Sequence, residues 1–137
     1  MIDTDYLRDR LLELVQTPSP VGMTGRAVAL VAGWLRELGF EPKYTRRGVL
    51  YVDVGDGAPR RALAAHLDTL GAMVTELKPN GRLALRNTGT WAARFAEGAR
   101  VTVFSDHATH RGTILPLKAS GHTFNDEVDT APIGWQH

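Results

Sequence analysis

The sequence contains no cysteine among its 137 residues. Disulfide bonds, thiolate zinc sites and thiol nucleophiles are therefore excluded, because each of them needs a sulfhydryl group. An excess of charge of one sign is also missing, since sixteen basic residues stand against fifteen acidic ones and leave a formal net charge of +1. A chain this balanced has no basic field to hold nucleic acid, and we expect no nucleic-acid partner.

Long apolar runs are missing as well. The N-terminus "MIDTDYLRDR" is polar and acidic, without the apolar segment of a signal peptide, and no later run is long enough to cross a bilayer. We therefore expect a cytoplasmic protein with no membrane contact. The chain still has 43% hydrophobic and 23% charged residues. That balance is typical of one ordinary globular domain or two small ones.

Two amphipathic helices are expected in the first forty residues. The first has leucine and valine at helical spacing between positions 7 and 15, and Asp3 or Thr4 can cap its start. The segment "TPSPVGMTG" (17–25) then ends it, because two prolines and two glycines cannot continue a helix. A second helix is expected between Thr24 and Gly39, with apolar residues along one face.

The rest of the chain has the pattern of β-structure. A strand pair is expected around Gly48, and the uniformly apolar "RALAAHLD" (61–68) is typical of a strand buried on both faces. Alternating runs on either side of Pro79-Asn80-Gly81 predict a hairpin. Further strands are expected at "ARVTVFS" (99–105) and "HRGTILPLK" (110–118). This order predicts an α/β layer followed by a small antiparallel β-barrel or sandwich, with the helices confined to the first forty residues.

His66 and Asp68 are the leading candidates for chemistry. Residues two apart in a strand face the same side, and this pair stands at the expected C-terminal end of a strand, where α/β sheets place their ligands. A carboxylate beside a metal-binding imidazole holds the second ring nitrogen, so the pair fits a metal site. On spacing alone, a buried His–Asp pair or a simple turn, without a ligand, is the commoner arrangement.

The other histidines carry weaker signals. His107 and His110 in "HATH" have a spacing seen at metal sites, but no third ligand lies near them in the sequence. A solvated hairpin tip is expected there. His122 lies in the polar stretch "KASGHTFNDEVD" and is expected in a surface loop, with a subunit contact or a neighbouring active site as the alternative.

Taken in order, the segments of this chain resemble the start of the M42 glutamyl-aminopeptidase-like metallopeptidases. "LLELVQTPSPVG", "LRELGF", "RRGVLYVDVG" and "AHLDTLGAMV" follow one another as they do in that family. The last motif usually reads His-x-Asp-Glu-Ile-Gly-x-Met-Val in the family. The matching residues here are His66, Asp68, Gly71, Met73 and Val74. Thr69 departs from the pattern, since it stands where the family usually has glutamate.

The resemblance implies an α/β fold in two parts. Residues 1–76 would form the N-terminal part of a zinc-peptidase-like catalytic layer. Residues 77–137 would form an incomplete, barrel-like dimerisation domain, through which the protein makes a homo-oligomer. Two stretches, "GTWAARFAEGARV" and "LPLKASGHTFNDEVD", look most like a bacterial subgroup associated with the osmoprotectant N-acetylglutaminylglutamine amide.

The resemblance also implies an aminopeptidase that hydrolyses the N-terminal peptide bonds of short peptides. Two divalent metal ions would activate the attacking water; zinc is expected, with cobalt or manganese as alternatives. By this resemblance His66 would ligate one ion and Asp68 would orient that imidazole.

The family's remaining ligands and its catalytic glutamate have no counterpart here, because the sequence contains no Asp-Asp-x-x-Gly or Glu-Glu motif. One imidazole and one carboxylate cannot hold two ions. The chain is therefore expected to be an N-terminal fragment that has an incomplete site and is inactive alone. The alternative is a non-catalytic, β-rich interaction or oligomerisation module with a structural His66–Asp68 pair.

Overall fold

The structure is a computed structural model that describes residues 2–58 and 61–135. It divides into two compact units, Met1–Gly71 and Ala72–His137. The first unit contains two long helices and a short hairpin, and the second contains most of the β-structure. The sequence-based domain boundary between residues 76 and 77 stays a prediction.

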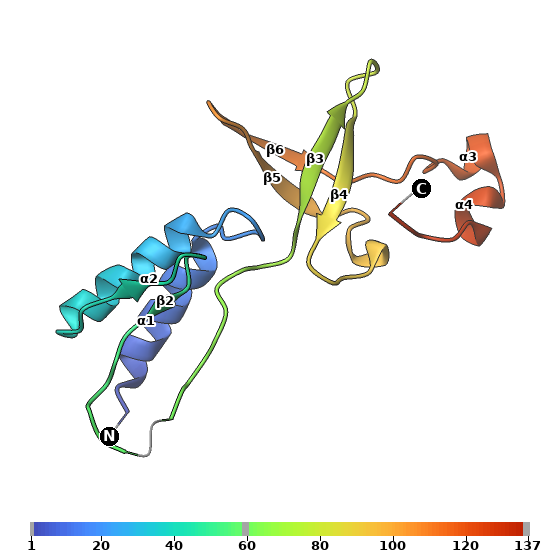
Figure 1. The fold of residues 1–137 in the computed structure, drawn as a ribbon. Coiled ribbons are helices and arrows are strands. Elements are labelled where there is room, and N and C mark those ends of the chain that lie inside the picture. Colours follow the sequence, from blue (N-terminus) through green and yellow to red (C-terminus); the bar gives the residue numbers. More distant parts are fainter. Residues whose placement is uncertain (1, 59–60, 136–137) are drawn as a thin grey trace. The chain divides into compact units, whose positions relative to one another are not determined.

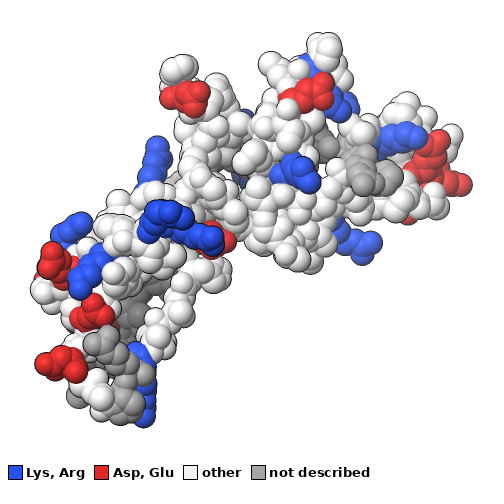
Figure 2. All heavy atoms as spheres, in the orientation of Figure 1, with Lys and Arg blue, Asp and Glu red and all other residues white. Residues whose placement is uncertain are grey.

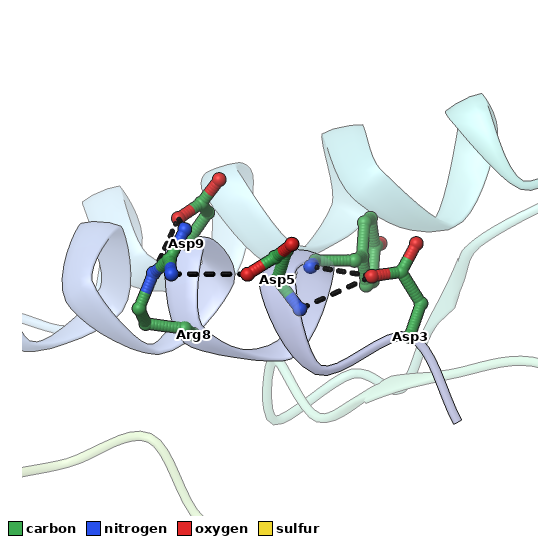
Figure 3. Close-up of polar contacts among 5 residues, drawn as sticks. Asp3, Asp5, Arg8 and Asp9 are labelled. Carbon is green, nitrogen blue, oxygen red and sulfur yellow. Dashed lines mark hydrogen bonds and ion pairs between the residues drawn. The ribbon is translucent and has the colours of Figure 1, made fainter.

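The first helix, α1, spans Thr4–Gln16, and its start is fixed by Asp3. The Asp3 carboxylate accepts hydrogen bonds from the backbone N–H groups of Asp5, at 3.1 Å, and Tyr6, at 3.0 Å (Figure 3). A helix start leaves four N–H groups without an intrahelical partner, and this side chain satisfies two of them. The predicted cap is confirmed.

The second helix, α2, spans Gly25–Glu37. It stops as predicted at Gly39, whose φ of +83° lies in the left-handed region that glycine adopts without strain. Thr24 holds the predicted N-cap position, but its side chain caps no N–H group among the described residues.

Arg10 links α1 to α2, which lie side by side (Figure 1). Its guanidinium carbon is 5.3 Å from the ring centroid of Tyr6 and 5.1 Å from that of Trp34. A cation held between two aromatic faces is attracted to both. The Arg10 guanidinium also forms an ion pair with Glu13, in which Nη1 and Oε2 are 3.0 Å apart.

A short hairpin follows the helices. Strands β1 (Lys43–Tyr44) and β2 (Leu50–Tyr51) pair antiparallel around Gly48, which has a φ of +82°. This pair was predicted. Lys43 also binds Asp53 at 3.0 Å, and that hydrogen bond raises the pKa of the Lys43 ammonium group.

Residues 61–68 do not form the buried strand that their apolar composition predicted. They form an extended segment outside the named strands (Figure 1). Leu67 is half-buried, and the other side chains of this segment are exposed. Beyond them Thr69 makes a single parallel bridge to Pro20. A strand buried on both faces needs hydrogen-bonded neighbours and a covering layer, and the described residues supply only that bridge.

Two hairpins carry the β-structure that follows. Strands β3 (Gly71–Leu77) and β4 (Leu83–Thr88) flank the predicted turn at residues 79–81. Strands β5 (Arg100–Phe104) and β6 (Thr109–Thr113) pair antiparallel. Both hairpins are confirmed, each as a separate two-stranded sheet. Closure into a barrel stays a prediction.

Three short helical turns interrupt this second unit. They are η1 (Ala93–Phe95), α3 (Gly121–Phe124) and α4 (Glu127–Thr130). The prediction that helices stop within the first forty residues was therefore wrong, because single turns are too short to show a helical period. The Trp135 indole N–H donates to the carbonyl of Trp91 at 3.3 Å, and the two rings meet edge to face.

Buried apolar side chains are scarce in both units. The fully buried hydrophobic residues of the described chain are three alanines, Ala27, Ala32 and Ala96. The accessible surface is 11700 Å² for a mass of 15.0 kDa. One compact domain of this mass exposes about 7,000 Å², and two separate domains of half the mass expose about 8,500 Å² together. The chain therefore exposes roughly 3,000 Å² more surface than two separate domains would, and roughly 4,700 Å² more than one compact domain would.

The charged surface is mixed. On the face drawn in Figure 2, basic and acidic side chains are interspersed along the chain and do not gather into a field of one sign. Among the residues that the structure describes, no helix is long and apolar enough to cross a membrane.

We expect the purified chain to self-associate through its uncovered apolar faces. Leu7, Leu11 and Val15 form one exposed row on α1. Leu11→Lys should weaken association, because it places a charge in that row. Gln16→Lys adds the same charge to the opposite side of α1 and should not. Sedimentation velocity over a concentration series measures both, and sharp, reversible unfolding of a wild-type monomer would contradict the expectation.

The Asp3 cap gives a second prediction. Asp3→Ala should destabilise α1 by about 1 kcal/mol and lower the helical circular dichroism signal, whereas Asp3→Asn should retain both, since asparagine caps as well as aspartate. Asp9→Ala is the control. It removes an equal charge but only an exposed ion pair with Arg8 at 3.0 Å (Figure 3), which contributes little. Equal losses in Asp3→Ala and Asp9→Ala would show that Asp3 does not act as a cap.

Candidate functional site

His66 and Asp68 meet at the end of the extended segment. The imidazole Nδ1 lies 3.1 Å from the main-chain carbonyl oxygen of Asp68 and 3.3 Å from its carboxylate Oδ1. Because a carbonyl oxygen can only accept, Nδ1 must carry the hydrogen, an assignment that follows from the acceptor. In the neutral ring the lone pair then resides on Nε2.

The pair is open to approach from outside. The His66 side chain is 82% exposed and that of Asp68 is 45% exposed. The sequence left a buried pair, a simple turn and a metal site as alternatives, and in this chain the pair is formed but not buried. An imidazole with Nδ1–H bound to a carbonyl or carboxylate, and with a free lone pair on Nε2, is the arrangement that metal-ligating histidines use.

The set of side chains that could bind a metal ion at this pair is small. Within residues 2–58 and 61–135, no cluster of three or more histidine, cysteine, aspartate or glutamate residues could hold a metal ion. A structural or catalytic zinc takes at least three protein ligands. His66 offers one ring nitrogen, and the nearest carboxylate already faces Nδ1 of the same ring. These residues fit one corner of a metal site and do not fit a complete two-ion site.

Two backbone hydrogen bonds connect Thr69, the residue after Asp68, to the segment that follows α1. The Thr69 N–H donates to the carbonyl of Ser19 at 2.7 Å, and the Val21 N–H donates to the carbonyl of Thr69 at 3.2 Å. Ser19 is buried, and its hydroxyl has no hydrogen-bond partner in the described part of the chain. Both hydrogen bonds use main-chain atoms of Thr69, so any residue other than proline at this position could form them.

The contact between Ser19 and Thr69 was missed by sequence reasoning. "TPSPVGMTG" was interpreted as a helix breaker and as part of the family resemblance, but not as extended backbone, which a serine between two prolines also signals. Extended backbone presents its carbonyl to a neighbouring segment, but the sequence does not say which segment that is.

The remaining histidines lie apart from this pair in the chain. His107 is in the turn between β5 and β6, His110 is on β6, and both are exposed, as expected for a solvated hairpin tip. His122 lies in α3, where a loop was predicted, and is exposed. A subunit contact through His122 stays a prediction.

Comparison with known proteins gives concordant matches. A family model described as M42 glutamyl aminopeptidase matches residues 48–137. "Putative aminopeptidase YhfE" of Bacillus subtilis is 34% identical over 117 residues, which cover 83% of this chain and 34% of the relative. "Glutamyl aminopeptidase" of Lactococcus lactis subsp. cremoris is 28% identical over 118 residues, which cover 84% of this chain and 32% of the relative.

The fold has a counterpart among solved structures. The TET aminopeptidase from a marine sediment archaeon, Thaumarchaeota archaeon, superposes with a TM-score of 0.83 and 22% sequence identity. The match covers 93% of this chain and 36% of the archaeal one. The chain thus spans about a third of the length of the relatives it matches.

Proposed function

The chain belongs to the M42 glutamyl aminopeptidase family, and from that premise we propose that it supplies one part of a metal-dependent aminopeptidase. The observation that carries the proposal is the His66–Asp68 pair. It lies inside the matched residues 48–137, and its Nδ1 contact leaves the Nε2 lone pair of an exposed imidazole available to a metal ion.

His66 is the proposed metal ligand, and Asp68 is the residue that orients its ring. Both oxygens of Asp68 that face Nδ1, the carbonyl and Oδ1, favour the tautomer with a free Nε2. Imidazole suits zinc, cobalt and manganese in a mixed nitrogen and oxygen site. When bound, two divalent ions would lower the pKa of water and stabilise the oxyanion formed at a peptide carbonyl.

Residues 1–137 are proposed to be inactive by themselves. His66 provides a single ring nitrogen, and no three-ligand cluster is present in the described residues. The proposed substrate is a short peptide with a free N-terminus, and the remaining ligands and a general base would have to come from outside these residues.

The proposed oligomeric assembly also rests on the resemblance to the M42 family. We propose that the hairpins of residues 77–137 form a barrel-like dimerisation domain and join copies of the protein into a homo-oligomer. The osmoprotectant subgroup and a cytoplasmic location stay predictions.

A non-catalytic interaction module is the second candidate. The accessible surface of 11700 Å² exceeds that of two separate domains by roughly 3,000 Å² and includes exposed leucines on α1. This favours the module, because exposed apolar surface is typical of a chain that binds other polypeptide. In that case the His66–Asp68 pair would have only a structural role.

The first test is turnover by residues 1–137. We expect the wild-type chain to release p-nitroaniline from glutamyl or leucyl p-nitroanilide no faster than His66→Ala does, with Zn²⁺, Co²⁺ or Mn²⁺ present. Turnover that a chelator abolishes and zinc restores would overturn the proposal that this part is inactive.

The second test uses the whole product of the reading frame if it continues past codon 137. We expect metal-dependent aminopeptidase activity, lost in His66→Ala together with bound metal. Asp68→Ala should lower metal affinity or activity by about 10- to 100-fold, because it acts through the ligand. Unchanged metal content in His66→Ala would reject the ligand assignment, and a stop codon directly after codon 137 would favour the interaction module.

A further inference from the structure

The peptide group between Asp68 and Thr69 is hydrogen-bonded at both ends. Its N–H, on Thr69, donates to the Ser19 carbonyl at 2.7 Å. Its C=O, on Asp68, accepts from Nδ1 of His66 at 3.1 Å. A peptide group is planar and rigid, so the direction of one bond determines the direction of the other. The Ser19 carbonyl, the peptide group and the imidazole therefore form one continuous chain of hydrogen bonds.

We propose that Ser19 is a positioning residue for His66: its carbonyl, acting through the 68–69 peptide group, fixes the orientation and the tautomer of the imidazole. The use of that imidazole as a metal ligand rests on the proposed function. The hydrogen-bond chain does not depend on it, because it needs no metal.

The backbone around Ser19 is suited to this role. Ser19 stands between Pro18 and Pro20, and a residue before proline is confined to extended ψ values. Because ψ sets the direction of a residue's carbonyl, that of Ser19 is held before any contact forms. Ser19 is also buried, and the bond from Val21 N–H to the Thr69 carbonyl, at 3.2 Å, provides a second tie between the same segments.

The 68–69 peptide group needs such a tie. Residues 61–68 have no strand ladder to orient their carbonyls. The Asp68 carboxylate makes a longer contact of 3.3 Å from a side chain that is 45% exposed, so the carbonyl at 3.1 Å is the closer of the two acceptors for Nδ1. Hydrogen bonds in a chain polarise one another. The bond from Thr69 to Ser19 should therefore make the Asp68 carbonyl a better acceptor and strengthen its hold on Nδ1–H.

The test is the tautomer of His66, measured by magic-angle-spinning NMR on ¹⁵N-histidine-labelled chain without metal at pH 8. This method tolerates self-association, and a His66→Gln sample identifies the His66 signals among those of the five histidines. In the wild-type chain we expect the Nδ1–H form alone. Thr69→Pro deletes the N–H that binds Ser19, and the Nε2–H form should then become a major species.

Two matched variants separate positioning from general damage. Thr69→Ala keeps the backbone N–H, and Ser19→Ala keeps the carbonyl while removing the unpartnered hydroxyl, so both should retain the wild-type tautomer. Helix content from circular dichroism reports whether α1 and α2 survive in each variant. A Thr69→Pro chain with intact helices and an unchanged His66 tautomer would overturn the proposal, and so would an equal loss in Thr69→Ala.

If Thr69→Pro loses its helices, the wild-type spectrum decides. In a uniformly ¹³C,¹⁵N-labelled wild-type chain, an Nδ1–H ring with a through-hydrogen-bond coupling between the Thr69 ¹⁵N and the Ser19 carbonyl ¹³C supports the positioning role. An Nε2–H ring, or an absent coupling, overturns it. All of these outcomes are measured without metal or substrate, and a failed peptidase test leaves this hydrogen-bond chain intact.

Discussion

The segment that carries His66 and Asp68 is held by two backbone hydrogen bonds at Thr69, one to Ser19 and one from Val21. Everything proposed for the site depends on this tie. It places the 68–69 peptide group, the Asp68 carbonyl then binds Nδ1 of the imidazole, and that bond leaves the Nε2 lone pair free. Both bonds use main-chain atoms of Thr69, so they do not depend on the side chain at that position.

The two hydrogen bonds at Thr69 matter because few side chains of the described residues pack against the segment that carries His66 and Asp68. With three alanines as its fully buried hydrophobic side chains, the described chain lacks the packed layers that normally hold a central strand in an α/β sheet. The same shortage leaves Leu7, Leu11 and Leu12 of α1 exposed. The relatives that match this chain are about three times its length. A chain that covers about a third of them is expected to contain only some of the ligands of a metal site.

Features set by neighbouring residues could be predicted from the sequence. The Asp3 cap, the stop of α2 at Gly39 and the hairpin turn at Gly81 each depend on the local chemistry of a few residues. The two short helices α3 and α4 were not predicted, because four residues carry no helical period. The family resemblance came from the order of several segments, and the family match confirms it.

Features set by distant partners could not be predicted. The apolar run at 61–68 was expected to be a strand, but a strand exists only where other strands pair with it, and composition says nothing of whether they are present. His66 and Asp68 do meet, as their two-residue spacing suggested. The closest contact, however, uses the backbone carbonyl of Asp68. Its orientation depends on Ser19, far away in the sequence, and no pattern near the motif indicates that partner.

The central claim is that His66 presents a single free Nε2 to a metal ion in an otherwise incomplete site. A zinc titration of ¹⁵N-histidine-labelled chain tests it most directly, with His107 and His110 as internal comparisons. The account predicts that the Nε2 signal of His66 shifts before theirs, with weak affinity, and that this response weakens in Thr69→Pro, in which the Nε2–H form becomes a major species. Zinc bound at His107 and His110 while His66 is unaffected, or two ions held tightly by residues 1–137, would contradict it.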